Sequence, residues 1–247
     1  MFMKNIHGGD IYKYENVTDF SANINPMGIP ESVREAVVNS LEMCENYPQM
    51  FCDDLREKIG RRYGVDSSFI ICGNGASDVL YRYVFAIKPK NAVVAAPCFA
   101  EYEAALECVG AKVEYYQINH NTFEIEDDFM EMFEYKPDMI FLCNPNNPTG
   151  VLTTNQFIIK VLKKALITNT IIVIDESFLD FMETNNEYSS KGLLNYYDNL
   201  IVVKSLTKFF AIPGARIGYG LCKNNVLINE INKVTVPWSI NIIAADA

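Results

Sequence analysis

Histidine and tryptophan are scarce in this chain of 247 residues, which has two histidines and one tryptophan. Basic residues are also few, with 21 Lys plus Arg against 31 Asp plus Glu and a formal net charge of −10. The shortage of histidine argues against a histidine-based zinc site, and we expect no metal. Because no basic block exists, nucleic acid and anionic membranes are not expected partners.

Long apolar runs are missing as well. The segment from Met1 to His7 lacks the apolar core of a signal peptide, and no stretch is long enough to span a bilayer. The seven cysteines contain no Cys-x-x-Cys pair, and Cys72, Cys98 and Cys143 lie in or beside strand-like stretches. This pattern predicts buried free thiols in a reducing cytoplasm.

Short apolar runs of strand length alternate with segments of helical spacing. The strand-like runs are Phe69–Cys72, Ala92–Ala96, Met139–Cys143, Ile171–Ile174 and Leu200–Val203. The helical segments are Pro30–Cys44, Asp53–Tyr63, Ala76–Ile87, Ala100–Val109 and Gln156–Ile167, and a surface loop is expected over Glu183–Lys191. Continuous apolar strands separated by helices predict an α/β fold with a mostly parallel central sheet and helices on both faces.

Polar and glycine-rich clusters follow four of the predicted strands. Residues 73–77 follow the first strand, 144–150 the third, 175–176 the fourth and 205–208 the fifth. Ligands of open α/β sheets bind beyond the carboxyl ends of the strands. We therefore expect the four clusters to form one site.

Lys208 and its neighbours carry the groups needed to bind a phosphorylated aldehyde. A lysine amine can form a Schiff base with an aldehyde, and Ser205, Thr207 and Arg216 can hold a phosphate. The glycine-rich turn at residues 73–77 adds backbone N–H groups at a helix start, which suit phosphate. Pyridoxal 5'-phosphate (PLP) has both an aldehyde and a phosphate. Taken singly, the lysine is also typical of a solvated surface charge. The turn at residues 73–77 is also typical of an ordinary strand-to-helix connection.

Three further residues fit the ring of the same cofactor. Asp175 ends an apolar strand, where a desolvated carboxylate needs a cationic partner such as a pyridinium nitrogen. The alternative for Asp175 is a helix cap or a magnesium ligand, although the chain has no Gly-x-x-x-x-Gly-Lys-[Ser/Thr] loop. Asn147 can donate to a phenolate oxygen, and its bond to Pro148 is a candidate cis peptide. Phe99 can stack on a flat ring or simply belong to the core.

These residues, in this order, resemble fold-type I PLP-dependent enzymes of the aminotransferase class I/II superfamily. The resemblance depends on Asn-Pro-x-Asn-Pro-Thr-Gly at 144–150, Asp-Glu at 175–176, Ser-x-Thr-Lys at 205–208, and an arginine eight positions after the lysine (216 − 208). It extends from His7 to Ala247. It is greatest to the threonine-phosphate decarboxylases of cobalamin biosynthesis, which are relatives of the histidinol-phosphate aminotransferases.

The resemblance implies a role for each site residue. Lys208 and Asp175 would be catalytic, the first bonded to the cofactor aldehyde and the second paired with its ring nitrogen. The other implied cofactor contacts are Gly75, Ala76, Ser77, Phe99, Asn147, Ser205, Thr207, Arg216 and, reaching the neighbouring site of a symmetric homodimer, Tyr47. The implied substrate contacts are His7, Asn25 and Asn147, and the implied substrate is a small amino acid phosphate.

The resemblance also implies a domain organisation. An N-terminal arm and helix would occupy residues 1–45, a PLP-binding large domain residues 46–235, and the start of a long helix residues 236–247. The small C-terminal domain to which that helix leads, with its arginine for the substrate carboxylate, would be largely missing. Phe178 stands where many aminotransferases of this class have a tyrosine, which favours the decarboxylase branch.

Three activities are open at this point. The resemblance favours decarboxylation of L-threonine-O-3-phosphate to (R)-1-amino-2-propanol phosphate. The first alternative is a histidinol-phosphate or other class I/II aminotransferase, and the second is a truncated PLP-binding remnant without turnover. The residues alone do not choose between decarboxylation and transamination, because the outcome depends on how the protein holds the substrate carboxylate.

Overall fold

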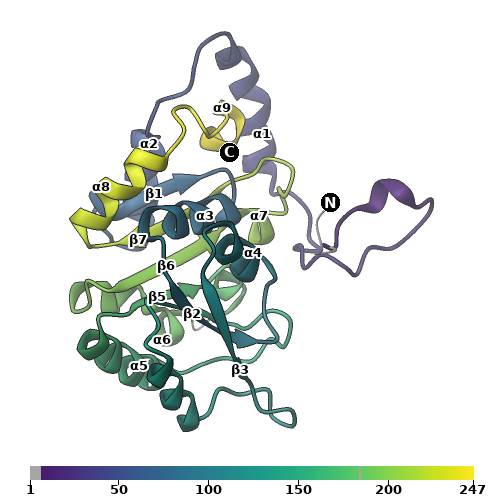
Figure 1. The fold of residues 1–247 in the computed structure, drawn as a ribbon. Helices are drawn as coiled ribbons and strands as arrows, with labels where there is room; N and C mark the ends of the chain where they lie inside the picture. Colours follow the sequence, from purple (N-terminus) through teal and green to yellow (C-terminus); the bar gives the residue numbers. More distant parts are fainter. Residues whose placement is uncertain (1–6, 184) are drawn as a thin grey trace.

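A seven-stranded sheet runs through the centre of the computed structural model, which describes residues 7–183 and 185–247 (Figure 1). The strands are β1 (Ile70–Gly73), β2 (Asn91–Ala96), β3 (Lys112–Gln117), β4 (Met139–Cys143), β5 (Ile171–Asp175), β6 (Leu200–Ser205) and β7 (Gly218–Cys222). Their order is β1-β7-β6-β5-β4-β2-β3, and neighbouring strands are parallel except at β7, which is antiparallel to both β1 and β6. The mostly parallel sheet that the apolar runs predict is confirmed.

Helices connect these strands. The α-helices are α1 (Glu31–Ser40), α2 (Asp53–Tyr63), α3 (Ala76–Ile87), α4 (Glu101–Cys108), α5 (Asn155–Thr168), α6 (Asn185–Tyr188), α7 (Leu206–Phe209), α8 (Asn225–Val234) and α9 (Ile242–Asp246). The 3-10 helices are η1 (Ile11–Lys13), η2 (Leu41–Glu45), η3 (Ser67–Phe69), η4 (Asp127–Tyr135), η5 (Leu179–Phe181) and η6 (Ser190–Asn195). The helix predicted from Pro30 is α1 followed by η2, with Pro30 as the N-cap. Helix α2 ends where predicted, because Gly64 adopts the left-handed conformation there (φ 67°).

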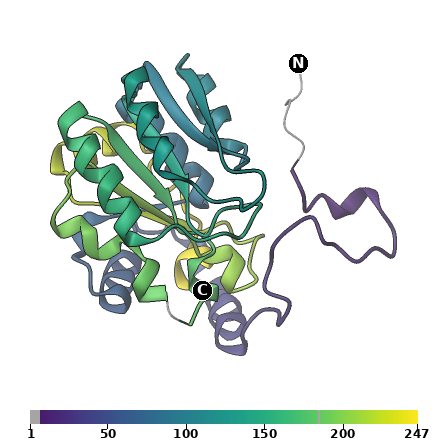
Figure 2. The ribbon, with the colours of Figure 1, turned by 90° about the horizontal axis from the view of Figure 1, so that it is seen from below.

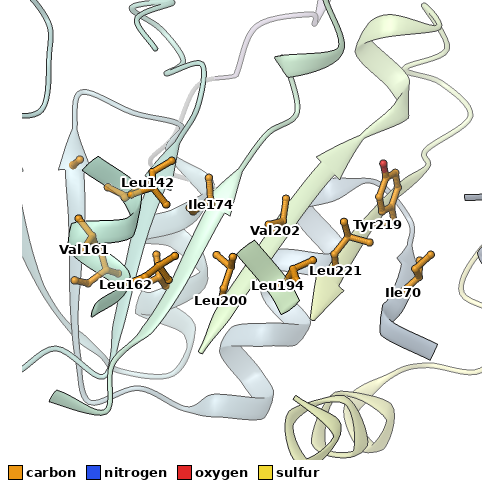
Figure 3. Close-up of a cluster of buried hydrophobic side chains, with 14 of the residues drawn as sticks. Ile70, Leu142, Val161, Leu162, Ile174, Leu194, Leu200, Val202, Tyr219 and Leu221 are labelled. Atoms are coloured by element: carbon orange, nitrogen blue, oxygen red, sulfur yellow. The ribbon is translucent and has the colours of Figure 1, made fainter. Parts of the chain in front are cut away.

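Alternate residues of the central strands pack against opposite helical layers. In β5, Ile172 and Ile174 belong to a buried cluster that includes Val161 and Leu162 of α5, whereas Val173 belongs to a second cluster with residues of α3, α4 and α8. Figure 3 shows the first cluster, in which side chains of β4, β5 and β6 face α5. Since both faces of these strands are buried, their sequences are continuous apolar runs.

Two strands are not among the predicted runs. Strand β3 lies at the edge of the sheet and mixes charged with aromatic residues, and Lys112 is exposed. Strand β7 contains Gly218 and Gly220, and glycine is depleted in strands. Both glycines lie where a larger residue would be too close to its neighbours. A Cβ on Gly220 would lie 2.7 Å from the ring of Tyr83, and a Cβ on Gly218 would meet the backbone of Ala76. Helix α8 is likewise absent from the predicted elements.

The surface loop predicted over Glu183–Lys191 is wrong in its second half. Helices α6 and η6 pass through this stretch, and Ser189 and Ser190 are buried, with exposed fractions of 7% and 0%. Both serines are buried because they bond a buried acid: Ser189 Oγ donates to Glu176 Oε2 at 2.9 Å, and the Ser190 N–H donates to Glu176 Oε1 at 2.5 Å. Composition alone hid this contact, since serine and asparagine are equally typical of loops.

The carboxyl ends of the parallel strands meet at one edge of the sheet. Gly73 at the end of β1 and Ser205 at the end of β6 are each in register with Gly218 at the start of β7. Residues 10–20, drawn in purple, project away from the body of the protein in both ribbon views (Figures 1 and 2). Segments that are far apart in the sequence thus meet at the carboxyl edge of the sheet.

All seven cysteines are free thiols. Cys72 and Cys143 are buried as predicted, whereas Cys98 is partly exposed. Across residues 7–183 and 185–247, no helix combines the length and the apolar character needed to cross a membrane.

Candidate active site

A cavity of about 710 Å³ lies at the carboxyl edge of the sheet, within the size range of small-molecule sites. Its lining comes from the loops that follow β1, β2, β4, β5 and β6, and from the N-terminal arm. Ten of the predicted site residues line it: His7, Ala76, Ser77, Phe99, Asn147, Asp175, Ser205, Thr207, Lys208 and Arg216. The structure thus brings together residues spread over 210 positions (from His7 to Arg216) of the sequence.

Three predicted site residues do not line this cavity. Gly75 lies under Arg216, and a Cβ at this position would be 2.9 Å from the guanidinium carbon. Asn25 supports the loop of Lys208, because its side-chain amide donates to the carbonyl of Phe209 at 2.8 Å and its backbone N–H donates to that of Lys208 at 3.1 Å. Tyr47 is 81% exposed and packs on Trp238, with ring centroids 5.1 Å apart.

The start of α3 and the loops around Ser205 form a cup for an anion. The first N–H groups of a helix have no partner within the helix and carry partial positive charge, and Ala76 and Ser77 are the first residues of α3. The hydroxyls of Ser205 and Thr207 lie 2.8 Å apart. Among the residues that the structure describes, Arg216 makes only two long contacts, at 3.4 Å, to carbonyl oxygens, so its guanidinium has donors left for a phosphate.

An ion pair between the buried Arg82 and the partly exposed Asp78 fixes the turn that carries this cup. The Asn74 N–H donates to Asp78 Oδ2 at 2.8 Å, and Arg82 Nε donates to Asp78 Oδ1 at 3.0 Å. Arg82 also donates from Nη2 to the hydroxyl of Ser239 at 2.8 Å and is only 5% exposed. Neither Asp78 nor Arg82 was a predicted site residue. Their i,i+4 spacing at the start of a helix was the one available signal.

Asp175 holds its carboxylate in a closed environment at the end of β5. The Ser177 N–H donates to Oδ1 at 2.9 Å, and the Tyr102 hydroxyl donates to Oδ2 at 2.8 Å. Burial raises the pKa of Asp175 above its ordinary value, while the bonds from Ser177 and Tyr102 and the charge of Lys208 act in the opposite direction.

Lys208 is partly buried, and its amine makes no hydrogen bond or ion pair within the part of the chain that the structure describes. Burial, and then the nearby charge of Arg216, lower the pKa of this lysine, while Asp175 opposes the shift. A lysine with a lowered pKa has more of its neutral, nucleophilic form at neutral pH. The amine is therefore available for bond formation.

Asn147 and Phe99 are placed by one network of loop contacts. The side-chain amide of Asn146 donates to the carbonyl of Pro97 at 3.1 Å and to the Thr149 hydroxyl at 3.0 Å, which ties the loop after β4 to the loop after β2. The Asn147–Pro148 peptide is cis, as predicted.

Several cavity residues were not predicted as site residues. Glu101 is within 2.6 Å of His7 Nε2, and its other oxygen accepts a bond from the Tyr81 hydroxyl at 2.9 Å. Tyr102 reaches Asp175 from the same helix. Glu101 and Tyr102 follow the second predicted strand, so their position at the shared edge was a usable signal. Tyr81 lies within α3, and nothing in the sequence pointed to it.

The residues of the cavity fit PLP. The cofactor needs an amine for its aldehyde, an acid for its ring nitrogen, donors for its phosphate and an apolar surface for its ring. Lys208 supplies an unpaired amine, Asp175 an acid with one donor on each oxygen, and the start of α3 an anion cup. The aromatic ring of Phe99 faces the same cavity.

Comparison with known proteins gives one consistent result. The family described as aminotransferase class I and II matches residues 15–247. The chain is 33% identical over 248 aligned residues to a threonine-phosphate decarboxylase of Salmonella typhimurium, an alignment that covers 97% of this chain and 68% of the relative.

Solved structures agree with this result. The histidinol-phosphate aminotransferase of Clostridium acetobutylicum has a TM-score of 0.85 and 31% identity, covering 93% of this chain and 67% of that one. The L-threonine-O-3-phosphate decarboxylase of Porphyromonas gingivalis has a TM-score of 0.80 and 28% identity, covering 92% and 66%. The chain thus spans about two thirds of the length of these relatives. On the strength of the family match over residues 15–247, this chain belongs to the aminotransferase class I and II family of PLP-dependent enzymes.

Proposed function

We propose that the chain forms the cofactor-binding large domain of an enzyme that decarboxylates L-threonine-O-3-phosphate to (R)-1-amino-2-propanol phosphate, in the cytoplasm. The observation that carries the proposal is the unpaired amine of Lys208 in a cavity that also contains Asp175 and the anion cup. When bound, PLP supplies an electron sink for the α-carbon of an amino acid.

The residues of the chain divide the work of binding and proton transfer. Lys208 would hold the cofactor covalently and then carry protons at its amine, which its lowered pKa favours. Asp175 would keep the ring nitrogen protonated. Asn147 would donate to the ring oxygen and Phe99 would lie against the ring, as the sequence implies.

The anion cup would fix the cofactor at its phosphate. Ala76, Ser77, Ser205, Thr207 and Arg216 all line the cavity, and together they offer backbone, hydroxyl and guanidinium donors. Gly75 would act indirectly, by leaving room for Arg216.

The substrate would enter beside the N-terminal arm. His7 lines the cavity and lies against Glu101, where it could contact the phosphate of an amino acid phosphate. Asn25 would act indirectly, since its contacts run to the loop of Lys208.

A symmetric homodimer would complete the site. Tyr47 lies far out on the surface, and apolar side chains with exposed fractions of 42–56% surround it in sequence: Leu41, Met43, Met50 and Phe51. An apolar patch formed by such side chains would suit a protein interface. In such a dimer, the Tyr47 hydroxyl would reach the cofactor phosphate of the neighbouring subunit.

Three observations bear on the choice of reaction. The 33% identity to the Salmonella decarboxylase and the presence of Phe178 in the cavity favour decarboxylation. The TM-score of 0.85 to the Clostridium aminotransferase supports transamination as a second candidate. A PLP-binding chain without turnover is the third.

One experiment separates these candidates. The absorption spectrum of the protein with PLP is recorded before and after addition of threonine phosphate, with and without 2-oxoglutarate, and carbon dioxide is measured. A decarboxylase releases carbon dioxide without the oxo acid, an aminotransferase needs the oxo acid, and a non-catalytic chain shows the visible band without product.

The same spectrum tests the role of the lysine. Lys208→Ala should abolish the visible band of covalently bound PLP, whereas Lys163→Ala, at an exposed position of α5, should retain it. A band that persists in Lys208→Ala would refute the assignment.

A further inference from the structure

The hydroxyl of Tyr102 has a partner that the proposed reaction does not yet explain. Tyr102 is fully buried, at 0% exposure, in the first turn of α4, and its hydroxyl donates to Asp175 Oδ2 at 2.8 Å. The two residues are 73 positions apart, and they join α4 to the end of β5. The contact therefore exists only in the folded protein.

The ring of Tyr102 is held so that its hydroxyl points in one direction. It stacks on Phe141 of β4, with centroids 5.1 Å apart and planes at 10°, and it meets Phe99 edge-on at 5.7 Å and 82°. Buried aromatic contacts of this kind fix both torsions of the side chain. Because the ring cannot swing, the position of the Asp175 carboxylate is fixed with it.

The donors around Asp175 leave room for one more partner. Oδ1 accepts from the Ser177 N–H and Oδ2 from Tyr102, whereas an ionised carboxylate offers about four acceptor sites. Tyr102 stays a donor, because burial raises its own pKa well above the ordinary tyrosine value. Burial raises the pKa of Asp175 too, and the Tyr102 bond is one of the contacts that lower it.

Other ionisable groups near this carboxylate are few in the described part of the chain. The thiol of Cys143, on β4, is buried and has a raised pKa, so it is neutral. Lys208 contributes a positive charge that favours the ionised form of Asp175. Glu176, the residue after the end of β5, bonds Ser189 and Ser190 instead.

We propose that Tyr102 is a positioning residue for the cofactor: its hydroxyl keeps the Asp175 carboxylate oriented and ionised, so that Asp175 can pair with the ring nitrogen. This inference depends on the proposed use of PLP. It adds that the strength of the Asp175 ion pair is set from α4, by the hydroxyl that donates to Asp175 Oδ2.

Tyr102→Phe tests the proposal, since it removes the hydroxyl and keeps the ring. Tyr83→Phe is a matched control, because Tyr83 is also fully buried but its hydroxyl has no hydrogen-bond partner among the described residues. The carboxyl ¹³C signal of Asp175 is followed against pH in protein labelled at aspartate, and is assigned by its loss in Asp175→Asn. PLP affinity is measured by titration of the cofactor-free protein.

In Tyr102→Phe, the Asp175 signal should titrate at higher pH than in the wild type, and PLP should bind roughly tenfold more weakly. In the Asp175→Asn background, Tyr102→Phe should cause no further loss of affinity, because both changes act through one carboxylate. Tyr83→Phe should change neither quantity. A purely structural role for Tyr102 would lower stability and leave the Asp175 titration where it was.

The outcomes separate this inference from the proposed function. If wild-type protein shows no Lys208-dependent PLP band, the proposed function fails. If that band is present and Tyr102→Phe leaves both the Asp175 titration and the PLP affinity unchanged, the role of Tyr102 is refuted. Should Tyr102→Phe not fold, the wild-type titration decides alone: Asp175 protonated at pH 7 overturns the inference, and Asp175 ionised at pH 7 supports it.

Discussion

Gly218→Ala is expected to displace the anion cup. Gly218 begins β7 and lies against the start of α3, where a Cβ would be 2.8 Å from the carbonyl carbon of Gly75 and 2.9 Å from Ala76 Cα. Ordinary van der Waals contact begins at 3.4 Å, so these distances are too short by 0.6 and 0.5 Å. These neighbours are backbone atoms, which cannot rotate away as a flexible side chain can.

The size of the effect follows from this displacement. Forcing an additional methyl group into a packed position costs about 1–3 kcal/mol, which for a chain of this length corresponds to a fall in Tm of roughly 2–12 °C. A binding site tolerates displacements of only about 0.5 Å before its geometry is lost. Loss of one charged hydrogen bond to the phosphate from Ala76 or Ser77 would weaken PLP binding about tenfold or more.

Thermal unfolding of the cofactor-free protein and PLP titration measure the two effects separately. Gly214→Ala is the control, because no described residue other than its two chain neighbours has an atom within 4 Å of the position that its Cβ would take. Equal Tm values and equal PLP affinities for the two variants would show that β7 and α3 are not packed as described. A lower Tm with unchanged PLP affinity would place the phosphate elsewhere than at the start of α3.

Two further predictions concern the ring site and the lysine. Phe99→Ala should weaken PLP retention by the loss of stacking, about 0.5–1.5 kcal/mol beyond the loss of buried area, as measured by PLP titration; unchanged affinity would mean that the ring does not lie on Phe99. Burial, followed by the charge of Arg216, lowers the pKa of Lys208. At pH values below the ordinary lysine pKa of about 10.4, the folded protein therefore disfavours the charged form of this lysine relative to the unfolded chain. Lys208→Met should therefore raise the Tm of the cofactor-free protein at pH 7, and the gain should shrink as the pH rises towards that value; a gain independent of pH would contradict this reasoning.

Apolar patterning was enough to predict five of the seven strands of the central sheet, but not β3 or β7. The runs at Met139–Cys143 and Ile171–Ile174 became β4 and β5 with little or no change in their ends, because a strand buried on both faces has few tolerated residue types. The helix ends at Gly64 and at the start of α3 were also predictable, since cap positions have strong local preferences.

The candidate site was predictable to the extent that its chemistry follows strand ends. Asp175 stands directly after an apolar run, Asn147 and Lys208 stand in the polar clusters that follow two others, and the parallel sheet brings such positions to one edge. Their roles in binding PLP stay predictions, as does the reach of Tyr47 into a neighbouring subunit.

By itself the sequence determined five of the seven strands, the helices α1 to α5 and the chemical groups that stand at the strand ends, because each of these depends on local composition and period. Only the tertiary structure decided that β7 pairs between β1 and β6 and brings Gly218 against α3. It alone decided that Tyr102 bonds Asp175, and that Arg82 holds the turn at Asn74 through Asp78. Such contacts join residues whose separation along the chain carries no periodic signal, and they form only when the sheet and its helices have packed.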